Sequence, residues 1–218
     1  MLWALGQPVA LAGLLAGFAL AVVLRAVVQH AVASRGRFAR RHRLFHPRRD
    51  VDVFGAVAAV LGGTGWGRRG PDGPDGRPST AVLLAGPFAV LIASQLAFGA
   101  YKVAGDPLLL QLANASMVLQ GVPGDAVSQL LLSFAVSLLC FGLLALVPLP
   151  PLDGWGLVAG RAGPRPSQGF AKAQHWLDDQ NLGVVILLIG LVIPLAAGAP
   201  LFLFLLDFVT APVFAAWA

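Results

Sequence analysis

A single carboxylate, Asp153, stands at the end of a long apolar run in the stretch LVPLPPLDGWGLV, residues 146–158. Carboxylates of this kind bind metal ions or pair with cations. Three residues break the first apolar run of the chain, Arg25, Gln29 and His30, and two of them, Arg25 and His30, are candidate cations. Because an ionised acid in apolar surroundings is costly unless it is paired, the sequence predicts an ion pair between Asp153 and one of these two residues.

Two further histidine groups have spacings that metal sites use. His42 and His46 in HRLFH lie at i and i+4, but Arg43 follows the first of them and further arginines surround the segment, so a divalent cation would be repelled. His175 shares one predicted helix face with Asp178 and Asp179. The first segment is better interpreted as a basic interfacial stretch, and the second as an acidic helix start.

The composition is that of a membrane protein. Of 218 residues, 57% are apolar and only 11% are charged, with a mean hydropathy of +0.79. A lipid bilayer is therefore the expected solvent. All ten acidic residues are Asp, so no Glu can act as a general base. The single cysteine, Cys140, lies inside an apolar run, and we expect it to be a packing residue.

The apolar runs predict an all-α polytopic fold in one membrane domain over residues 1–218. Four runs are long enough to span, since about 20 residues cross a hydrocarbon core of about 30 Å. These spans are 8–33, 81–104, 126–148 and 183–206. The apolar stretch 53–66 is too short and too Gly-rich to cross, so it predicts a re-entrant or interfacial hairpin. Gly13 and Gly17 have the spacing that lets a neighbouring helix approach closely.

The basic residues predict the orientation of the chain. The segment 34–80 carries ten of the thirteen Arg, and 151–182 carries most of the remaining bases, whereas 105–125 has none. By the positive-inside rule, 34–80 and 151–182 are cytoplasmic loops of a multi-pass protein of the cell membrane, with both termini outside. Arginines at a cytoplasmic helix end also attract anionic lipid, and this interpretation is favoured over nucleic-acid binding.

Several stretches resemble, in order and spacing, the motifs of the site-2 protease family, the intramembrane zinc metalloproteases. VPLPPLDGW resembles the NxxPxPxLDGG motif, LLAGPFAV (83–90) resembles AGPxxN, and AVVQHAVASR (26–35) resembles the end of the helix that carries HExxHxxxA. The hydrophobic stretch 46–69 resembles the hairpin between them. The similarity covers roughly residues 20–158 and implies a three-helix core. The Pro and Gly residues that shape the motifs are retained as Gly86, Pro87, Pro148, Pro150 and Gly154.

The resemblance implies a loss of catalysis. The family's chemistry uses two His at i and i+4, a Glu beside the first, and an Asp as the third zinc ligand. His30 and Asp153 match two ligands, but Ala26 and Val27 stand at the first His and the Glu. The Asn residues of the other two motifs, which belong to the substrate groove, fall on Val90 and Ala145. No catalytic residue is therefore expected, and two ligands are too few to retain zinc.

The sequence thus predicts a site-2-protease-like membrane protein without peptidase activity, which binds or regulates membrane protein partners or is a subunit of a membrane complex. The partner is expected to be a transmembrane segment, and an oligomer is also compatible with the sequence. One alternative is an active zinc metalloendopeptidase that recruits His42, His46 or His175 as a ligand. Another is a small transporter or channel in which Arg25, His30 and Asp153 line a polar path.

Overall fold

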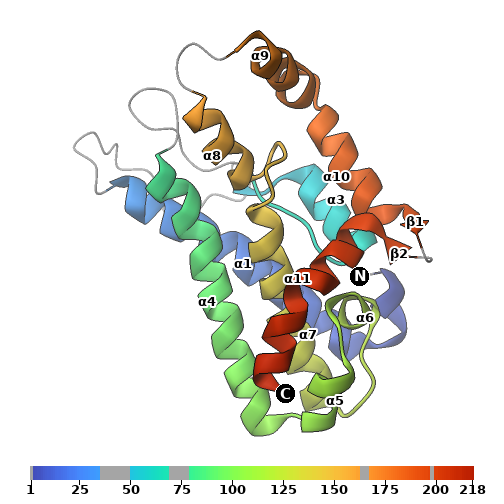
Figure 1. The fold of residues 1–218 in the computed structure, drawn as a ribbon. Helices are drawn as coiled ribbons and strands as arrows, with labels where there is room; N and C mark the ends of the chain where they lie inside the picture. Colours follow the sequence, from blue (N-terminus) through green and yellow to red (C-terminus); the bar gives the residue numbers. More distant parts are fainter. Residues whose placement is uncertain (1, 35–49, 69–78, 163–166, 197–198) are drawn as a thin grey trace.

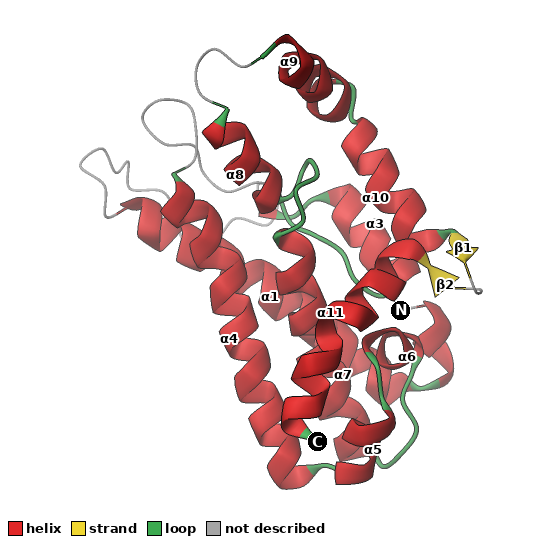
Figure 2. Cartoon of the chain, viewed as in Figure 1, coloured by secondary structure: helices red, strands yellow, loops and turns green. Residues whose placement is uncertain are grey.

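The structure is a computed structural model that describes residues 2–34, 50–68, 79–162, 167–196 and 199–218. Helices dominate these residues, and two very short strands pair near the end of the chain (Figure 2). In chain order, the elements that shape the core are η1 (Leu2–Gly6), α1 (Pro8–Ser34), α3 (Val53–Gly62), α4 (Thr80–Ala104), α5 (Pro107–Leu112), α6 (Ala115–Gln120) and α7 (Ala126–Ala145). After them come α8 (Asp153–Arg161), α9 (Gln168–Gln174), the π-helix η2 (His175–Asp179), α10 (Leu182–Val192), β1 (Pro194–Ala196), β2 (Ala199–Pro200) and α11 (Leu201–Trp217).

Three long helices, α1, α4 and α7, pack against one another and form the centre of the molecule (Figure 1). They contain 27, 25 and 20 residues, and each is long and apolar enough to cross a membrane. At 1.5 Å per residue, even the shortest is about 30 Å long, the thickness of a hydrocarbon core. The first three predicted spans are therefore helices. The third ends at Ala145 rather than 148, and Pro148 disfavours helix in the residue before it.

Helices α1 and α7 meet through small residues. A Cβ atom added to Gly17 would lie 2.7 Å from the Ser137 Cβ and 2.8 Å from the Phe134 carbonyl oxygen. One turn earlier, a Cβ on Gly13 would lie 3.0 Å from the Ser133 Cβ. The close approach lets the Ser137 hydroxyl donate a hydrogen bond of 3.0 Å to the Leu14 carbonyl. The expected helix contact at Gly13 and Gly17 is thus confirmed, with α7 as the partner.

The substitution Gly17→Ala is expected to lower the free energy of unfolding by about 1–3 kcal/mol, because the added methyl group overpacks the contact with α7. Gly160→Ala is the matched control, since a Cβ on Gly160 of α8 has no neighbour within 4 Å. Both changes gain the same helix propensity, so the difference between them isolates the clash. Thermal melting of the two variants in detergent measures the effect, and equal melting temperatures would contradict the packing shown here.

The fourth predicted span, 183–206, is wrong as a single helix. Helix α10 stops at Val192, the chain forms the β1–β2 hairpin, and α11 starts at Leu201. Pro194 pairs with Pro200 across this hairpin, and proline interrupts a helix because it lacks the donor N–H. Before α10, the helical segment formed by α9 and η2 is bent by 65° relative to α10. Counting that bent pair as one span gives up to four crossings in the part of the chain that is described.

The stretch 53–66 forms a short helix and a return segment rather than a plain hairpin. Helix α3 has ten residues, and the Asp52 carboxylate caps its start by accepting the N–H of Phe54 at 2.9 Å. The chain turns at Gly63, whose φ of +88° is a left-handed conformation that suits glycine. It then returns to pair Val51 with Gly67 in an isolated bridge. This return brings residues 67 and 68 next to α1.

Candidate functional site

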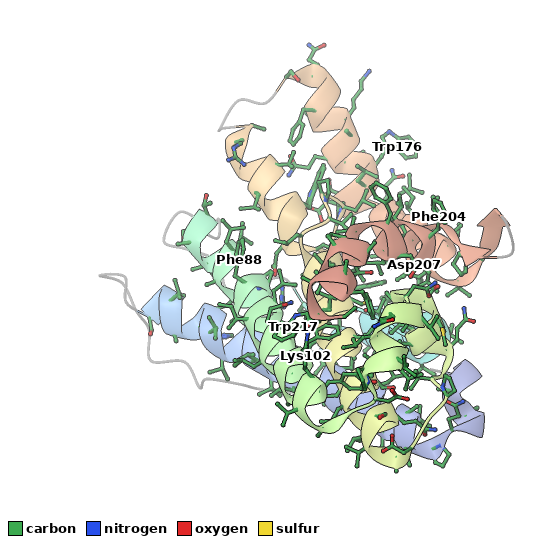
Figure 3. The ribbon with its side chains drawn as sticks, turned by 60° about the horizontal axis from the view of Figure 1, so that its bottom comes forward. Phe88, Lys102, Trp176, Phe204, Asp207 and Trp217 are labelled. Atoms are coloured by element: carbon green, nitrogen blue, oxygen red, sulfur yellow. The ribbon has the colours of Figure 1, made fainter. Side chains whose placement is uncertain are left out.

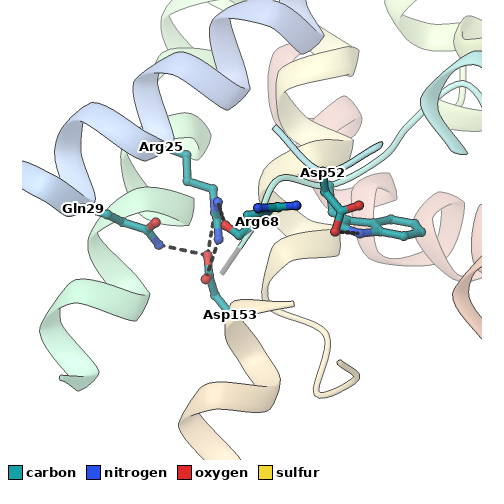
Figure 4. Close-up of polar contacts among 6 residues, drawn as sticks. Arg25, Gln29, Asp52, Arg68 and Asp153 are labelled. Atoms are coloured by element: carbon teal, nitrogen blue, oxygen red, sulfur yellow. Dashed lines mark hydrogen bonds and ion pairs between the residues drawn. The ribbon is translucent and has the colours of Figure 1, made fainter. Parts of the chain in front are cut away.

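Arg25 of α1 and Asp153, at the start of α8, form a buried bidentate ion pair (Figure 4). The Arg25 Nε atom donates to Asp153 Oδ2 at 2.7 Å, and Nη2 donates to Oδ1 at 2.6 Å. The two side chains are 3% and 0% exposed. Two parallel bonds of this kind are the strong, orientation-specific form of the Arg–carboxylate contact. The structure therefore places two of the residues singled out in the sequence in direct contact, across 128 positions of the chain.

Asp153 reaches this position because the chain folds back after α7. The proline-bearing stretch between the helices ends with Leu152, and Asp153 is the first residue of α8. Pro150 is buried in this turn, whereas Pro148 is exposed. A Cβ on Gly154 would overlap the main-chain carbonyl of Leu146, so only glycine lets α8 start this close to the end of α7. The close approach at Gly154 therefore positions the carboxylate of Asp153.

The Ala-Gly-Pro segment of α4, residues 85–87, lets α4 pack closely against α1 at the ion pair. A Cβ on Gly86 would lie 2.7 Å from the Arg25 Cγ and 2.9 Å from the Gln29 Cγ, so α4 and α1 are in close contact at the ion pair. Pro87 is buried within α4, and its carbonyl oxygen lies near Gly142 of α7. Gly86 and Pro87 thus mark the level at which all three long helices meet.

Two more hydrogen bonds complete the polar cluster. The Gln29 amide donates to Asp153 Oδ2 at 3.0 Å, and Arg25 Nη1 donates to the main-chain carbonyl of Arg68 at 2.6 Å. Gln29 is only 1% exposed. The cluster therefore ties together three parts of the chain: helix α1, the start of α8, and the segment that returns after α3. We call Arg25, Gln29 and Asp153 the polar clamp.

His30, which the sequence named with Asp153 as a residual ligand position and as a candidate partner of Asp153, lies outside the polar clamp. Its Nδ1 atom lies 2.7 Å from the Ala26 carbonyl oxygen, one turn back on the same helix. The hydrogen bonds that Asp153 receives within the described part of the chain come from Arg25 and Gln29. Successive helix residues are 100° apart, so the stripe of Arg25 and Gln29 faces Asp153 while that of Ala26 and His30 is rotated away.

The remaining positions of the resemblance are apolar and packed. Ala26 is 4% exposed, and Val27 is half-buried. Val90 and Ala145, which stand at the Asn positions of the motifs, are 0% and 3% exposed. They therefore lie inside the core.

Of the two other histidine groups singled out in the sequence, the structure describes only the one at His175. His42 and His46 lie outside the residues that the structure describes. His175 pairs with Asp179 at 3.0 Å on an exposed face, with the side chains 58% and 69% exposed. Among the residues that the structure describes, no group of three or more His, Cys, Asp or Glu side chains is placed to hold a metal ion.

The residues at the polar clamp do not fit zinc. A zinc site in the resembled family needs two imidazoles and a carboxylate, with a position left for water. Here a guanidinium, which cannot be deprotonated in proteins, uses both oxygens of the carboxylate, and Gln29 offers a weak neutral amide. A divalent cation would have to displace Arg25 and would be repelled by its charge.

Sequence reasoning missed Gln29 and the carbonyl of Arg68. A signal for Gln29 was present, because Arg25 and Gln29 are four residues apart and therefore share a helix face. No signal pointed to the carbonyl of Arg68, since it reaches Arg25 only through the turn after α3.

The three long apolar helices are consistent with an integral membrane protein, and the core that they form is helical. Comparison of the chain with protein-family models, with curated proteins and with solved structures finds no match in any of the three.

Proposed function

We propose that this chain is a membrane protein built on a site-2-protease-like core that has exchanged its metal centre for an ion pair, and that it binds membrane protein partners without cleaving them. The observation that carries the proposal is the bidentate bond of Arg25 to Asp153, the residue that matches the family's carboxylate ligand. A fixed cation on that carboxylate performs the charge neutralisation that a metal ion would otherwise supply.

The spacing of the polar clamp on α1 supports this proposal. It also shifts the match to HExxHxxxA by one residue, so that the two His positions fall on Arg25 and Gln29. Arg25 and Gln29 lie at i and i+4 and both contact Asp153, as two histidine ligands would. In this register Ala26 occupies the position of the catalytic Glu, and Ala33 matches the final Ala of HExxHxxxA. The position of the general base is therefore a methyl group, and no proton acceptor stands beside the polar clamp on this helix face.

A partner-binding role follows from what remains of the scaffold. The three helices still meet at Gly86 and Pro87, and the polar clamp ties α1 to the start of α8 beside this contact. Such a core presents long apolar helix faces to the bilayer, with exposed side chains such as Phe88, Ile92 and Leu96 on α4. A transmembrane segment can pack on these faces while the core stays closed.

Two measurements on the purified protein test the proposal. After expression with added zinc, we expect less than about 0.1 zinc ion per chain, since the clamp offers a single carboxylate ligand. Cross-linking in native membranes is expected to yield a defined protein partner that an equally tagged, unrelated multi-pass protein does not capture. Stoichiometric zinc would overturn the loss of the metal centre, and the absence of any specific partner would overturn the binding role.

A further inference from the structure

A second polar site lies away from the clamp, in a pocket between α11, the short helix α5 and the turn that leads from α5 into α6. Its volume is about 220 Å³. The walls are mostly small or apolar side chains, with three polar residues among them. The lining includes Gln111, Asn114, Asp207, Ala211, Phe214 and Ala215.

Asp207 is the one charged residue of this pocket. Its Oδ1 accepts the main-chain N–H of Ser116 at 2.7 Å, and its Oδ2 accepts the Ser116 hydroxyl at 2.6 Å. These neutral donors satisfy hydrogen bonds but do not neutralise the negative charge. Among the described residues no cation is paired with Asp207, whereas Asp153 has Arg25.

The carboxylate lies well inside the apolar part of α11. At the end of this helix, the Trp217 indole donates to Gln95 at 2.8 Å, and Lys102 donates to the Trp217 carbonyl at 2.9 Å, so the end of α11 is docked on α4. Asp207 lies ten residues earlier, about 15 Å along the helix. Figure 3 shows the same separation, with Trp217 and Lys102 together and Asp207 further along α11. An ionised side chain at such a position is a functional group by default.

We infer that the Asp207 pocket receives the Lys or Arg side chain of a partner's transmembrane helix, which packs along α11. The inference rests on the proposed partner-binding role and names the surface that performs it. The charge of the occupant follows from Asp207, because a half-buried carboxylate on an apolar helix favours a cation as its partner. The occupant's shape follows from Ala211 and Ala215, which repeat at one-turn intervals beyond Asp207 and are exposed. Small residues in this pattern let a second helix come close enough for a basic side chain to enter the pocket.

The test uses a synthetic transmembrane helix of Leu and Ala with one central Lys and a neighbouring Cys, in phosphatidylcholine vesicles with the full chain. Ala211→Cys supplies an accessible thiol beside the pocket, since the native Cys140 is buried. We expect disulfide cross-linking to the Lys peptide to exceed that to the same peptide with Leu by at least about fivefold. Adding Asp207→Asn, which keeps the shape and an acceptor for Ser116, is expected to abolish this preference.

Asp179→Asn is the matched control, because it removes an exposed acid far from the pocket and is expected to leave the preference unchanged. Equal cross-linking of the two peptides, or a Lys preference that survives Asp207→Asn, overturns the inference. Cross-linking between two copies of the chain that excludes the peptide also overturns it. If native partners are still captured while the Lys preference is absent, this surface fails alone. If the preference holds but no native partner is found, the proposed function fails alone.

Discussion

Replacing Arg25 with leucine is expected to destabilise the protein by about 3–5 kcal/mol, because the variant leaves the Asp153 carboxylate buried without a cation. Asp153 is 0% exposed, so water cannot take over the lost interaction. The main-chain carbonyl of Arg68 also loses its hydrogen-bond donor. In a chain of this size the loss corresponds to a fall in melting temperature of roughly 10 °C. Thermal unfolding in detergent, followed by circular dichroism, measures it.

The double substitution Arg25→Leu with Asp153→Leu separates the pair from its surroundings. Removing both charges eliminates the unpaired ion, so we expect the double variant to regain at least about half of the stability lost in Arg25→Leu. Full recovery is not expected, since Gln29 still loses its acceptor. Arg25→Lys is expected to be intermediate, because an ammonium keeps the charge but not the two parallel bonds. A double variant as unstable as Arg25→Leu would contradict coupling between the two residues.

The sequence was sufficient for the features that depend on local composition. Each of the three long helices α1, α4 and α7 follows from a predominantly apolar run of about 20 residues or more, which has few alternatives to a spanning helix. The expectation of a cation beside Asp153 came from the energetic cost of an isolated intramembrane charge, and the structure pairs it with Arg25. Gly13 and Gly17 likewise indicated a close helix contact from their spacing alone.

The choice between Arg25 and His30 as the partner of Asp153 could not be made from the sequence. Both residues lie on α1 within two turns, and a rotation of one residue, 100°, exchanges the stripe that faces Asp153. That rotation is set by contacts far away in the chain, such as Gly17 against Ser137 and Gly86 against Arg25. Tertiary packing therefore determines which residues form the site. The motif spacing alone is compatible with either of two helix registers that differ by one residue.

Two other regions show why apolar content alone does not predict where helices begin and end. The run 183–206 has the hydropathy of a span, but Pro194 and Pro200 break it into α10, a hairpin and α11. The segment 105–125, between the second and third predicted spans, contains α5 and α6, which are too short to show a reliable period. Their stability depends on distant partners, such as Asp207 at the start of α6.

A zinc site is expected to appear when both α1 residues of the polar clamp become histidine, in the double variant Arg25→His with Gln29→His. The two imidazoles would lie at i and i+4 on the stripe that faces Asp153, giving three ligands and an open fourth position. An imidazole with its metal bond spans about the length of an arginine side chain, so the backbone need not move. We expect about one zinc ion per chain, and visible absorption of tetrahedral Co²⁺ as an independent readout. Because bound imidazole must be neutral, metal should be lost as the pH falls below about 6.

The variant Ala26→His provides the matched control for this conversion. With the native His30 it also carries two histidines at i and i+4, but on the stripe rotated away from Asp153, and it retains Arg25 on the carboxylate. It is therefore expected to bind no stoichiometric zinc. The two variants contain the same ligand types at the same spacing and differ in helix register by one residue. Metal binding by Ala26→His, and not by the Arg25→His and Gln29→His pair, would show that the original motif alignment is right and that the polar clamp does not occupy the metal position.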